Sequence, residues 1–245
     1  MADLAGRVVI VTGAARGLGR DYARNFAREG AHVVVADLKG AEGAAADASA
    51  AGARAIAVET DVTDRASVQA LMGRTIDEFG RLDILINNAG IWRGLAQAGL
   101  LDCPDELWDA AWKVNVNGTL YPCQAGAPLM KARGWGRIVN VSSVASAGGG
   151  DAYGLTKAAV EHMTSGLARA LGSFGITVNC IAPGISAFEG AKGQLPNFDQ
   201  IVAGMSIPRV GTTRDLYGAV RYLCSDEAEW VTGQTLRVDG GALAR

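Results

Sequence analysis

Short runs of apolar residues alternate along the chain with longer segments whose apolar residues recur at helical spacing. The first run, Val8-Val9-Ile10-Val11, has no polar interruption, which suits a strand covered on both of its faces. Similar runs, rich in β-branched residues, predict further strands at residues 32–37, 54–58, 83–86, 136–141 and 235–239. Helices are predicted at residues 17–28, 41–51, 64–79, 104–133 and 215–224, with another starting near Tyr153.

The alternation of strands and helices predicts an α/β fold. Strands separated by helices pair in parallel through right-handed crossovers, which builds a doubly wound sheet flanked by helices. No internal repeat, low-complexity linker or change of composition divides the 245 residues, and a single α/β domain can reach this length. We therefore expect one domain, residues 1–245, around a parallel sheet of about seven strands.

Composition and charge narrow the class of protein. A formal net charge of −2 and a pI near 5.7 provide no basic field for nucleic acid. The four cysteines and two histidines form no metal-ligand spacing, so we expect no metal site. The first six residues lack the apolar core of a signal peptide, and no apolar run is long enough to cross a bilayer. We expect a cytoplasmic protein with reduced thiols and no membrane partner.

A glycine-rich turn joins the first strand to the first helix. Its glycines follow the spacing Gly13-x3-Gly17-x-Gly19, with Arg16 and Leu18 between them. Glycines let the backbone turn tightly and approach a ligand closely, and the following helix would aim free N–H groups at an anion. The turn therefore predicts a phosphate site, although an ordinary strand-to-helix turn would share the same glycines.

Asp37 ends the second strand, twenty positions after Gly17. In a dinucleotide-binding unit, a carboxylate at about this place accepts hydrogen bonds from the adenosine ribose, and its charge repels a 2′-phosphate. The pattern favours NAD over NADP. Arg16 would attract an extra phosphate, but an exposed arginine gains less than the buried repulsion costs. A solvated aspartate that opens the next loop is the alternative interpretation.

Polar residues interrupt the chain at two further places. Asn87-Asn88-Ala89-Gly90 follows the fourth strand, where the carboxyl ends of parallel strands form a ligand crevice. The segment 113–118, with Asn115, Asn117 and Gly118, lies inside the long predicted helix although asparagine and glycine are poor interior helix residues. We interpret it as a backbone distortion that serves a nearby site, in preference to a tolerated weak spot.

Candidate proton-transfer residues follow the fifth strand. Ser142-Ser143 comes at its end, and Gly148-Gly149-Gly150 leads into a helix that carries Tyr153 and Lys157. Residues four apart lie one turn from each other on the same helix face. A nearby cation favours the phenolate and brings a tyrosine into a useful range for acid–base chemistry. A packed ring beside a solvated amine would have the same spacing.

Together these segments resemble the short-chain dehydrogenase/reductase family over essentially the whole chain. Thr12 to Gly19 resembles its TGxxxGxG turn, Asn87 to Gly90 its NNAG turn, and Tyr153 to Lys157 its YxxxK motif. Asn115 resembles its helix asparagine and Pro183-Gly184 its PG turn. The resemblance implies a Rossmann-type sheet and a hydride transfer between NAD and a carbinol or carbonyl carbon.

The resemblance also implies roles for individual residues. Tyr153 would be the acid/base, Lys157 would hold the nicotinamide ribose and lower the tyrosine's pKa, and Ser143 would hydrogen-bond the reacting oxygen. Asn115 would seat a water in a proton relay. The cofactor site would comprise Gly13, Arg16, Gly17, Leu18, Gly19, Asp37, Asp61, Val62, Asn88, Ala89, Gly90, Tyr153, Lys157, Pro183, Gly184 and Ile185.

The chain departs from the family pattern in two places. The ten positions from Ser143 to Tyr153 are fewer than the family commonly has, so the loop along the substrate is shortened. Either Ser142 or Ser143 then offers a hydroxyl, and by the family pattern we prefer Ser143. Phe188 lies near the position where the family often places a threonine against the carboxamide, so that hydrogen bond is missing or comes from Ser186.

Residues 186–210 form the least regular part of the chain, and we interpret them as a lid over the substrate. Trp92 could face the same pocket, and Arg93 or Arg209 could offer a partner to an anion, although all three could equally be surface residues. Ile207-Pro208-Arg209 and the C-terminal segment resemble the family's alcohol dehydrogenases of the phenylethanol type. The sequence therefore favours a small, partly apolar secondary alcohol or its ketone as substrate.

We expect an NAD-dependent alcohol dehydrogenase or ketone reductase that acts on a small molecule. A 3-oxoacyl thioester reductase is the first alternative, and it would be expected to use NADPH, against the charge of Asp37. A non-enzymatic dinucleotide sensor is the second, and retention of Tyr153 and Lys157 argues against it. The resemblance implies a homotetramer or homodimer, assembled through the long helices and the last strand.

Overall fold

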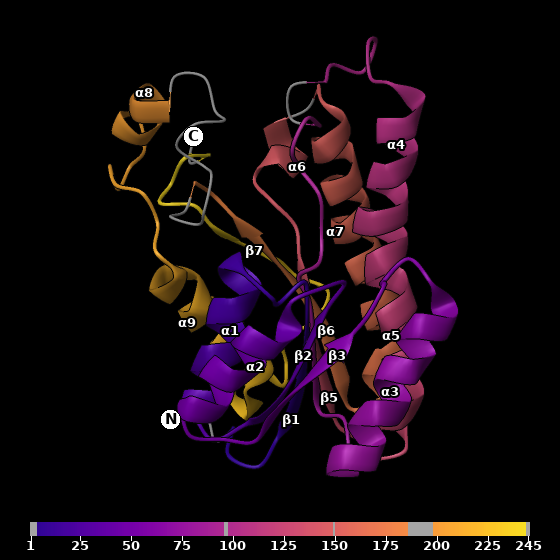
Figure 1. Ribbon diagram of the computed structural model, residues 1–245. Helices are drawn as coiled ribbons and strands as arrows, with labels where there is room; N and C mark the ends of the chain where they lie inside the picture. The colour runs from indigo at the N-terminus through magenta and orange to yellow at the C-terminus, as the bar shows by residue number, and fades with distance from the viewer. Residues whose placement is uncertain (1–3, 96–97, 149, 186–197, 244–245) are drawn as a thin grey trace.

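The fold is a seven-stranded parallel sheet between two layers of helices, shown in Figure 1. The computed structural model describes residues 4–95, 98–148, 150–185 and 198–243. The strand order is β3-β2-β1-β4-β5-β6-β7, and every pair is parallel. The strands are β1 Val8–Thr12, β2 His32–Asp37, β3 Ala55–Glu59, β4 Ile84–Asn87, β5 Gly136–Val141, β6 Ile176–Pro183 and β7 Thr235–Val238. The predicted fold class is confirmed, and β6 is the strand that the apolar pattern did not locate.

Helices cover both faces of this sheet. Figure 1 shows α1, α2 and α9 on one face and α3, α5 and α7 on the other. Their bounds are α1 Gly17–Arg28, α2 Ala41–Ala50, α3 Arg65–Phe79, α5 Gly118–Lys131, α7 Ala152–Leu171 and α9 Thr213–Cys224. Three shorter helices are α4 Asp105–Ala111, α6 Ala145–Gly148 and α8 Phe198–Ala203. Because β1, β4 and β5 lie in the middle of the sheet, both of their faces meet helices and all of their residues are buried.

The core consists of two apolar layers, one on each face of the sheet. In β1, Val9 and Val11 contact the layer under α1, α2 and α9, whereas Ile10 contacts the layer under α3, α5 and α7. Successive side chains of a strand point to opposite faces, so a strand that is buried on both sides needs an apolar residue at every position. This geometry explains the continuous apolar runs in the sequence.

The long helix predicted over residues 104–133 is interrupted. The structure has α4, then a π-helical turn at Trp112–Asn117, then α5. A Cβ at Gly118 would lie 2.7 Å from Cγ2 of Val62, so the chain after the π turn packs closely against the β3–α3 connection and a larger residue would have to displace Val62. Single π turns concentrate at functional sites, and the predicted distortion of this segment is thus a wider turn rather than a break.

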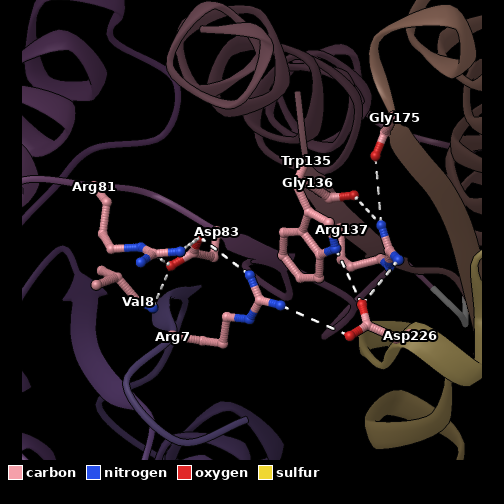
Figure 2. A network of polar contacts seen from close by, with 9 residues as sticks. All are labelled: Arg7, Val8, Arg81, Asp83, Trp135, Gly136, Arg137, Gly175 and Asp226. Atoms are coloured by element: carbon pink, nitrogen blue, oxygen red, sulfur yellow. Dashed lines mark hydrogen bonds and ion pairs between the residues drawn. The ribbon is translucent and has the colours of Figure 1, made fainter. Parts of the chain in front are cut away.

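A polar network closes the amino-terminal edge of the sheet, opposite the carboxyl ends of the strands (Figure 2). The guanidinium groups of Arg7 and Arg137 lie over the Trp135 ring, at 3.8 and 4.3 Å from its centroid. Asp226 accepts a hydrogen bond from Trp135 Nε1 and lies within ion-pair distance of both arginines. Buried Asp83 accepts from the Val8 N–H. These contacts stabilise the edge at which β1, β4 and β5 begin.

Candidate active site

The glycine-rich turn and the Asn87–Gly90 turn are joined by hydrogen bonds at the carboxyl ends of β1 and β4. The Thr12 hydroxyl oxygen accepts from the backbone N–H groups of Asn88 and Ala89, at 3.0 and 3.1 Å. In return, the Asn88 amide donates to the carbonyl oxygens of Thr12 and Gly13, at 2.9 and 3.0 Å. The two turns, 75 residues apart in sequence, are therefore held together as one unit by these hydrogen bonds.

The three glycines of the first turn have different structural causes. A Cβ at Gly13 would lie 2.7 Å from Cα of Ala89, and a Cβ at Gly19 would lie 2.5 Å from the carbonyl oxygen of Gly13. These two glycines permit close backbone packing. Gly17 has φ +58° and open space where its Cβ would point. It begins α1, whose N-terminus has no side-chain cap and no acidic residue in its first turn, so this helix end suits an anion.

Arg16 and Leu18, the other predicted residues of this turn, lie on either side of Gly17. Arg16 is exposed at the N-cap position of α1, with extended backbone angles and no capping bond from its side chain. Leu18 is half-buried and packs against the core under α1. The turn thus presents an exposed cation outward and a leucine inward, and of the two only the arginine can meet a charged ligand group.

Asp37 is held at the end of β2 beside the glycine turn. One carboxylate oxygen accepts from the Ala15 N–H and the other from the Leu38 N–H, both at 2.8 Å. Each oxygen keeps a further lone pair for a donor. The carboxylate is therefore fixed in position next to the turn, 22 residues away from Ala15 in sequence, as a predicted ribose-binding residue requires.

Asp61 and Val62 follow β3 at the same edge. The Asp61 carboxylate accepts from the Thr63 N–H at 2.8 Å, and its backbone N–H donates to Ser67 Oγ at 2.9 Å. Val62 is buried and contacts Gly118 at the start of α5. Asp61 thus stabilises its own turn with one carboxylate oxygen, and Val62 packs at the start of α5.

Asn115 lies fully buried in the π turn and binds the backbone after the Asn87–Gly90 turn. Its side-chain oxygen accepts from the Ile91 N–H at 2.8 Å, and its amide donates to the Ile91 carbonyl at 2.9 Å and to Thr156 Oγ1 at 3.0 Å. Both amide hydrogens thus have protein acceptors. The side chain joins β4, the π turn and α7, and its backbone carbonyl accepts from Thr119.

Lys157 is buried at the centre of the site. Its Nζ donates to the Val141 carbonyl oxygen at 2.8 Å, at the end of β5. A Cβ at Gly90 would lie 3.4 Å from Nζ, so Gly90 leaves room for the ammonium. Burial lowers the pKa of Lys157 to about 8. At neutral pH the side chain still carries most of its positive charge.

Tyr153 lies one helical turn before Lys157, whose Nζ is 5.6 Å from the centroid of the phenol ring. Burial raises the pKa of Tyr153 to about 12, against a smaller lowering by a hydrogen bond with the Ser143 side chain. The resemblance implied a lowered pKa for Tyr153, whereas burial raises it here. The reason is that desolvation of the phenolate outweighs the stabilisation that Ser143 provides.

The structure separates the roles of the two serines after β5. Ser142 is buried, and its hydroxyl faces α7, 2.8 Å from Glu161 Oε1 and 3.1 Å from the Lys157 carbonyl oxygen. Ser143 hydrogen-bonds Tyr153, and its oxygen accepts from the Ala145 N–H at 3.2 Å. Of the pair, Ser143 is therefore the one beside the phenol, which supports our preference for it.

The turn after β6 closes the other side of the crevice. A Cβ at Gly184 would lie 2.6 Å from Cα of Asp239, and the Pro183 carbonyl accepts from the Val144 N–H at 3.1 Å. The Ile185 carbonyl accepts from the Gly211 N–H at 2.9 Å. Pro183, Gly184 and Ile185 are thus tied to the chain after β5, to β7 and to residue 211. Ser186 and Phe188 lie outside the described residues.

The described part of the predicted lid is anchored at its end. Met205 is buried, and the Ile207 N–H donates to the Gly240 carbonyl at 2.8 Å. Arg209 forms a two-bond ion pair with Asp215, at 2.8 and 2.9 Å, so its charge is already matched. Arg93 is exposed. Of the two predicted anion partners, Arg209 is therefore paired with Asp215, which belongs to the capping box of α9.

An apolar cluster lines the approach to Tyr153. Leu95, Ala111 and Ala152 form its buried part, and partly buried residues pack against it: Ile91, Cys103, Leu107, Trp108 and Tyr153. Gly99 and Asp151 form an antiparallel bridge that joins the loop after β4 to the loop before α7. Apolar side chains from residues 91–95 and 103–111 thus pack beside Tyr153.

Sequence reasoning missed four residues of the site: Thr12, Gly154, Thr156 and Glu161. A signal existed for Gly154, because glycine is a poor residue inside a helix, and a Cβ there would lie 2.5 Å from the Ala145 carbonyl oxygen. Thr12 and Thr156 lie inside the motifs quoted from the sequence but received no role of their own, since a threonine at a strand end or in a helix is ordinary. Their hydrogen bonds depend on contacts between distant segments.

The described residues contain no group of three acidic, histidine or cysteine side chains arranged to hold a metal ion. Within the same residues, no helix has the length and apolar character needed to cross a membrane.

Known proteins are similar to this chain in sequence and in fold. A family model described as enoyl-(acyl carrier protein) reductase matches residues 13–242. An uncharacterised oxidoreductase of Mycobacterium tuberculosis H37Rv is 43% identical over 243 residues, covering 98% of each chain. Cyclohexanol dehydrogenase of Rhodococcus sp. strain TK6 is 38% identical over 264 residues, covering 97% of this chain and 96% of that one. A solved structure, a candidate short-chain alcohol dehydrogenase from Sinorhizobium meliloti 1021, superposes with a TM-score of 0.92 at 33% identity and covers 99% and 98%.

Proposed function

The chain belongs to the short-chain dehydrogenase/reductase family of oxidoreductases, and we propose that it transfers a hydride between NAD(H) and a small, partly apolar secondary alcohol or its ketone. The observation that carries this proposal is the grouping of Ser143, Tyr153 and Lys157 beside the glycine turn. Ser143 hydrogen-bonds Tyr153, and the Lys157 ammonium lies 5.6 Å from the phenol ring. A hydroxyl, a phenol and a cation at one place suit proton transfer to a carbonyl oxygen.

A nicotinamide dinucleotide fits the residues at the carboxyl ends of β1, β2 and β4. The uncapped N-terminus of α1 and the open space at Gly17 suit a pyrophosphate. The fixed Asp37 carboxylate suits the two hydroxyls of a ribose and opposes a 2′-phosphate, which favours NAD over NADP. When bound, the nicotinamide supplies or accepts the hydride.

Tyr153 would give its proton to the carbonyl oxygen in reduction and take it back in oxidation. With a pKa of about 12 the phenol is neutral at pH 7, which suits the donor in reduction. The Ser143 oxygen already accepts from the Ala145 N–H, so its own proton is free to bond the reacting oxygen or the phenol. Lys157 keeps a positive charge near the developing phenolate and would bind the nicotinamide ribose.

Asn115 would act in this scheme through position. Its amide hydrogens are bound to Ile91 and Thr156, so it holds the Asn87–Gly90 turn against α7. Because these hydrogens are bound, a water of a proton relay would accept a hydrogen bond from Lys157 Nζ and not from the Asn115 amide. The proposed role of Asn115 is therefore to fix the space in which such a water and Lys157 meet.

The apolar cluster beside Tyr153 supports a substrate with a hydrocarbon part. Ile91, Cys103 and Trp108 pack in the same cluster as Tyr153. Cyclohexanol dehydrogenase of Rhodococcus is one of the relatives, and a cyclic secondary alcohol has the mixed character that this cluster suits. We propose that residues 186–210 cover the substrate, with the chain from Met205 onward as the fixed end of this lid.

We propose a homodimer or homotetramer in a cytoplasmic setting. The edge strand β7 pairs only with β6 among the described strands, and its residues are all partly or fully exposed. Leu236 on β7 is 40% exposed and nearby Trp230 is 96% exposed. An apolar sheet edge of this kind suits a second copy. Size-exclusion chromatography with light scattering tests it, since Trp230→Ser should reduce the assembly mass.

Two other functions remain to be separated from this proposal. A reductase of 3-oxoacyl thioesters is suggested by one relative, a 3-oxoacyl-(acyl carrier protein) reductase of Staphylococcus aureus that is 36% identical over 239 residues, and such an enzyme would prefer NADPH and accept a thioester. A non-enzymatic dinucleotide sensor would bind NADH without turnover. The charge of Asp37 argues against the first, and the Ser143–Tyr153 hydrogen bond argues against the second.

A spectrophotometric screen tests the proposal directly. Secondary alcohols, ketones and a 3-oxoacyl thioester are each supplied with NAD(H) and with NADP(H), and the absorbance of the reduced cofactor is followed. We expect turnover of cyclic or short secondary alcohols with NAD. Turnover of the thioester alone, or a preference for NADPH, would assign the thioester reductase instead.

A further inference from the structure

Glu161 continues the face of α7 that carries the proposed catalytic residues. It lies four positions after Lys157 and eight after Tyr153, so the three side chains follow one another along the helix. The carboxylate oxygen Oε1 accepts from the Ser142 hydroxyl at 2.8 Å and from the Ser146 hydroxyl at 2.5 Å. One oxygen of a partly buried glutamate thus holds two serines from the chain after β5.

These two serines flank Ser143. The turn from 142 to 146 also contains the Ser146 N–H to Ser143 carbonyl bond at 3.0 Å, and the Ser143 oxygen accepts from Ala145 at 3.2 Å. A hydroxyl that has accepted one backbone N–H has a restricted direction for its own proton. Because both ends of the turn are attached to Glu161, the direction of the Ser143 hydroxyl depends on this carboxylate.

A second contact attaches the same turn to α7. A Cβ at Gly154, next to Tyr153, would lie 2.5 Å from the Ala145 carbonyl oxygen. The short helix α6 therefore rests on the first turn of α7 at Gly154 and on Glu161 two turns further along. Two separate attachments to one helix fix both the distance and the angle between Ser143 and Tyr153.

The charge of Glu161 has no cationic partner in the described part of the chain. No ion pair to this carboxylate is found there, and the neighbouring ammonium of Lys157 donates to Val141 instead. Hydroxyl groups that donate to a charged carboxylate form shorter and stronger bonds than neutral pairs do. The two serine hydroxyls are the donors that stabilise this charge.

We propose that Glu161 is a positioning residue for catalysis. It holds the turn 142–146 so that the Ser143 hydroxyl meets both Tyr153 and the oxygen of the substrate. This proposal rests on the proposed function, because Ser143 and Tyr153 are its proton-transfer residues. The shortened loop before Tyr153 makes the attachment necessary, since few residues of the loop itself remain to hold Ser143 in place.

Three variants test this role. Glu161→Ala removes the acceptor of both serine hydrogen bonds, and we expect kcat to fall by about tenfold to a hundredfold with NADH affinity within twofold of the wild type. Glu161→Gln keeps an oxygen acceptor and should retain at least about a third of the activity. Glu42→Gln removes an exposed carboxylate on α2, on the far side of the sheet, and is the matched control for lost charge.

A double-mutant cycle tests whether Glu161 acts through Ser143. If it does, Glu161→Ala costs little further activity in a Ser143→Ala background, because the group that it positions is already gone. The pH profile gives a second readout. Without the Ser143 hydrogen bond the pKa of Tyr153 rises, so the limb of alcohol oxidation that reports the phenolate moves up by about 0.5–1 pH unit.

Hydrogen–deuterium exchange tests the attachment without any substrate. Peptides that cover residues 142–148 should exchange faster in Glu161→Ala and in Ser146→Ala than in Glu161→Gln or the wild type. If the wild type reduces no ketone but this exchange pattern holds, the proposed function fails and the attachment stands. Unchanged exchange in Glu161→Ala, or losses that add fully in the double mutant, would overturn the positioning role.

Discussion

The Lys157 ammonium donates a hydrogen bond of 2.8 Å to the carbonyl oxygen of Val141. This bond holds a buried cation at the carboxyl end of β5, beside the strand end from which Ser143 follows. The backbone carbonyl directs the ammonium but brings no full charge, so burial dominates and lowers the pKa of Lys157 to about 8. The buried charge of Lys157 therefore lowers the free energy of unfolding.

That cost has a definite dependence on pH. Below about pH 8, Lys157 is charged in both the folded and the unfolded chain, and the penalty is complete. Between about 8 and 10.5 the unfolded chain binds the proton that the folded one has lost, so stability rises with pH. At pH 7 the free energy of unfolding of Lys157→Met should therefore exceed that of the wild type by about 3 kcal/mol, reduced by the contribution of the hydrogen bond that the variant loses. Urea unfolding at pH 7, 9 and 10.5 should show this difference in unfolding free energy becoming smaller as the pH rises. A difference independent of pH would contradict the lowered pKa.

Tyr153→Phe should abolish turnover while NADH binding stays within about twofold, because the ring is kept and only the transferable proton is lost. Stopped-flow and fluorescence titration separate the two effects. Tyr222→Phe, which changes a partly exposed tyrosine on α9, is the control. Turnover that survives in Tyr153→Phe would remove this residue from the mechanism.

Asp37→Asn should lower NADH affinity by about tenfold and narrow the preference over NADPH by at least that factor, since the ribose loses a charged acceptor and the 2′-phosphate loses its repulsion. The amide nitrogen also displaces one of the bonds from Ala15 and Leu38. Isothermal titration with both cofactors measures the change, with Glu42→Gln as control. An unaltered cofactor ratio would show that Asp37 does not face the ribose.

Three Gly→Ala substitutions separate packing from binding. Gly13→Ala places a Cβ against the Ala89 backbone and should destabilise the fold by about 2–4 kcal/mol. Gly17→Ala meets open space and should cost about 1 kcal/mol for its left-handed backbone, yet lower NADH affinity at least tenfold. Gly43→Ala, in α2 with no close neighbour, should stabilise by about 0.5–1 kcal/mol. Thermal melts and titrations check all three, and full NADH affinity in Gly17→Ala would place the phosphate elsewhere.

The polar network of Figure 2 should support stability without affecting catalysis. Arg137→Leu leaves the carbonyl oxygens of Ser225 and Gly136 without their side-chain donor and should destabilise by about 2–4 kcal/mol. Asp226→Ala, whose carboxylate is largely exposed, should cost about 1 kcal/mol. Because the network lies at the opposite edge of the sheet from Tyr153, kcat/KM should stay within twofold. A large loss of kcat/KM in a variant that is still folded would contradict this, because it would show that the network influences the site at the opposite edge of the sheet.

Much of the site could be predicted from the sequence because its motifs lie where strands end. The glycine turn follows β1 directly and the Asn87–Gly90 turn completes β4, so a correct reading of the strands places both at the crevice. The strand β6 was not located because its run, with Asn179 and Cys180 inside it, lacks the uniform apolar pattern of β1. The helix over 104–133 was predicted in one piece, with a distortion at 113–118 whose form was open, because a π turn adds only about one residue to a helical turn and leaves the apolar spacing nearly unchanged.

The sequence by itself determined the fold class and the residue types of the site, because a sheet buried on both faces demands apolar strands and fixes which ends carry the polar turns. Only the tertiary structure decided what each polar group does. It turned Ser142 toward Glu161 and Ser143 toward Tyr153, and it gave Asn115 its partners in Ile91 and Thr156. Hydrogen-bond partners and desolvation depend on which distant segments come into contact, and local sequence patterns do not specify those contacts.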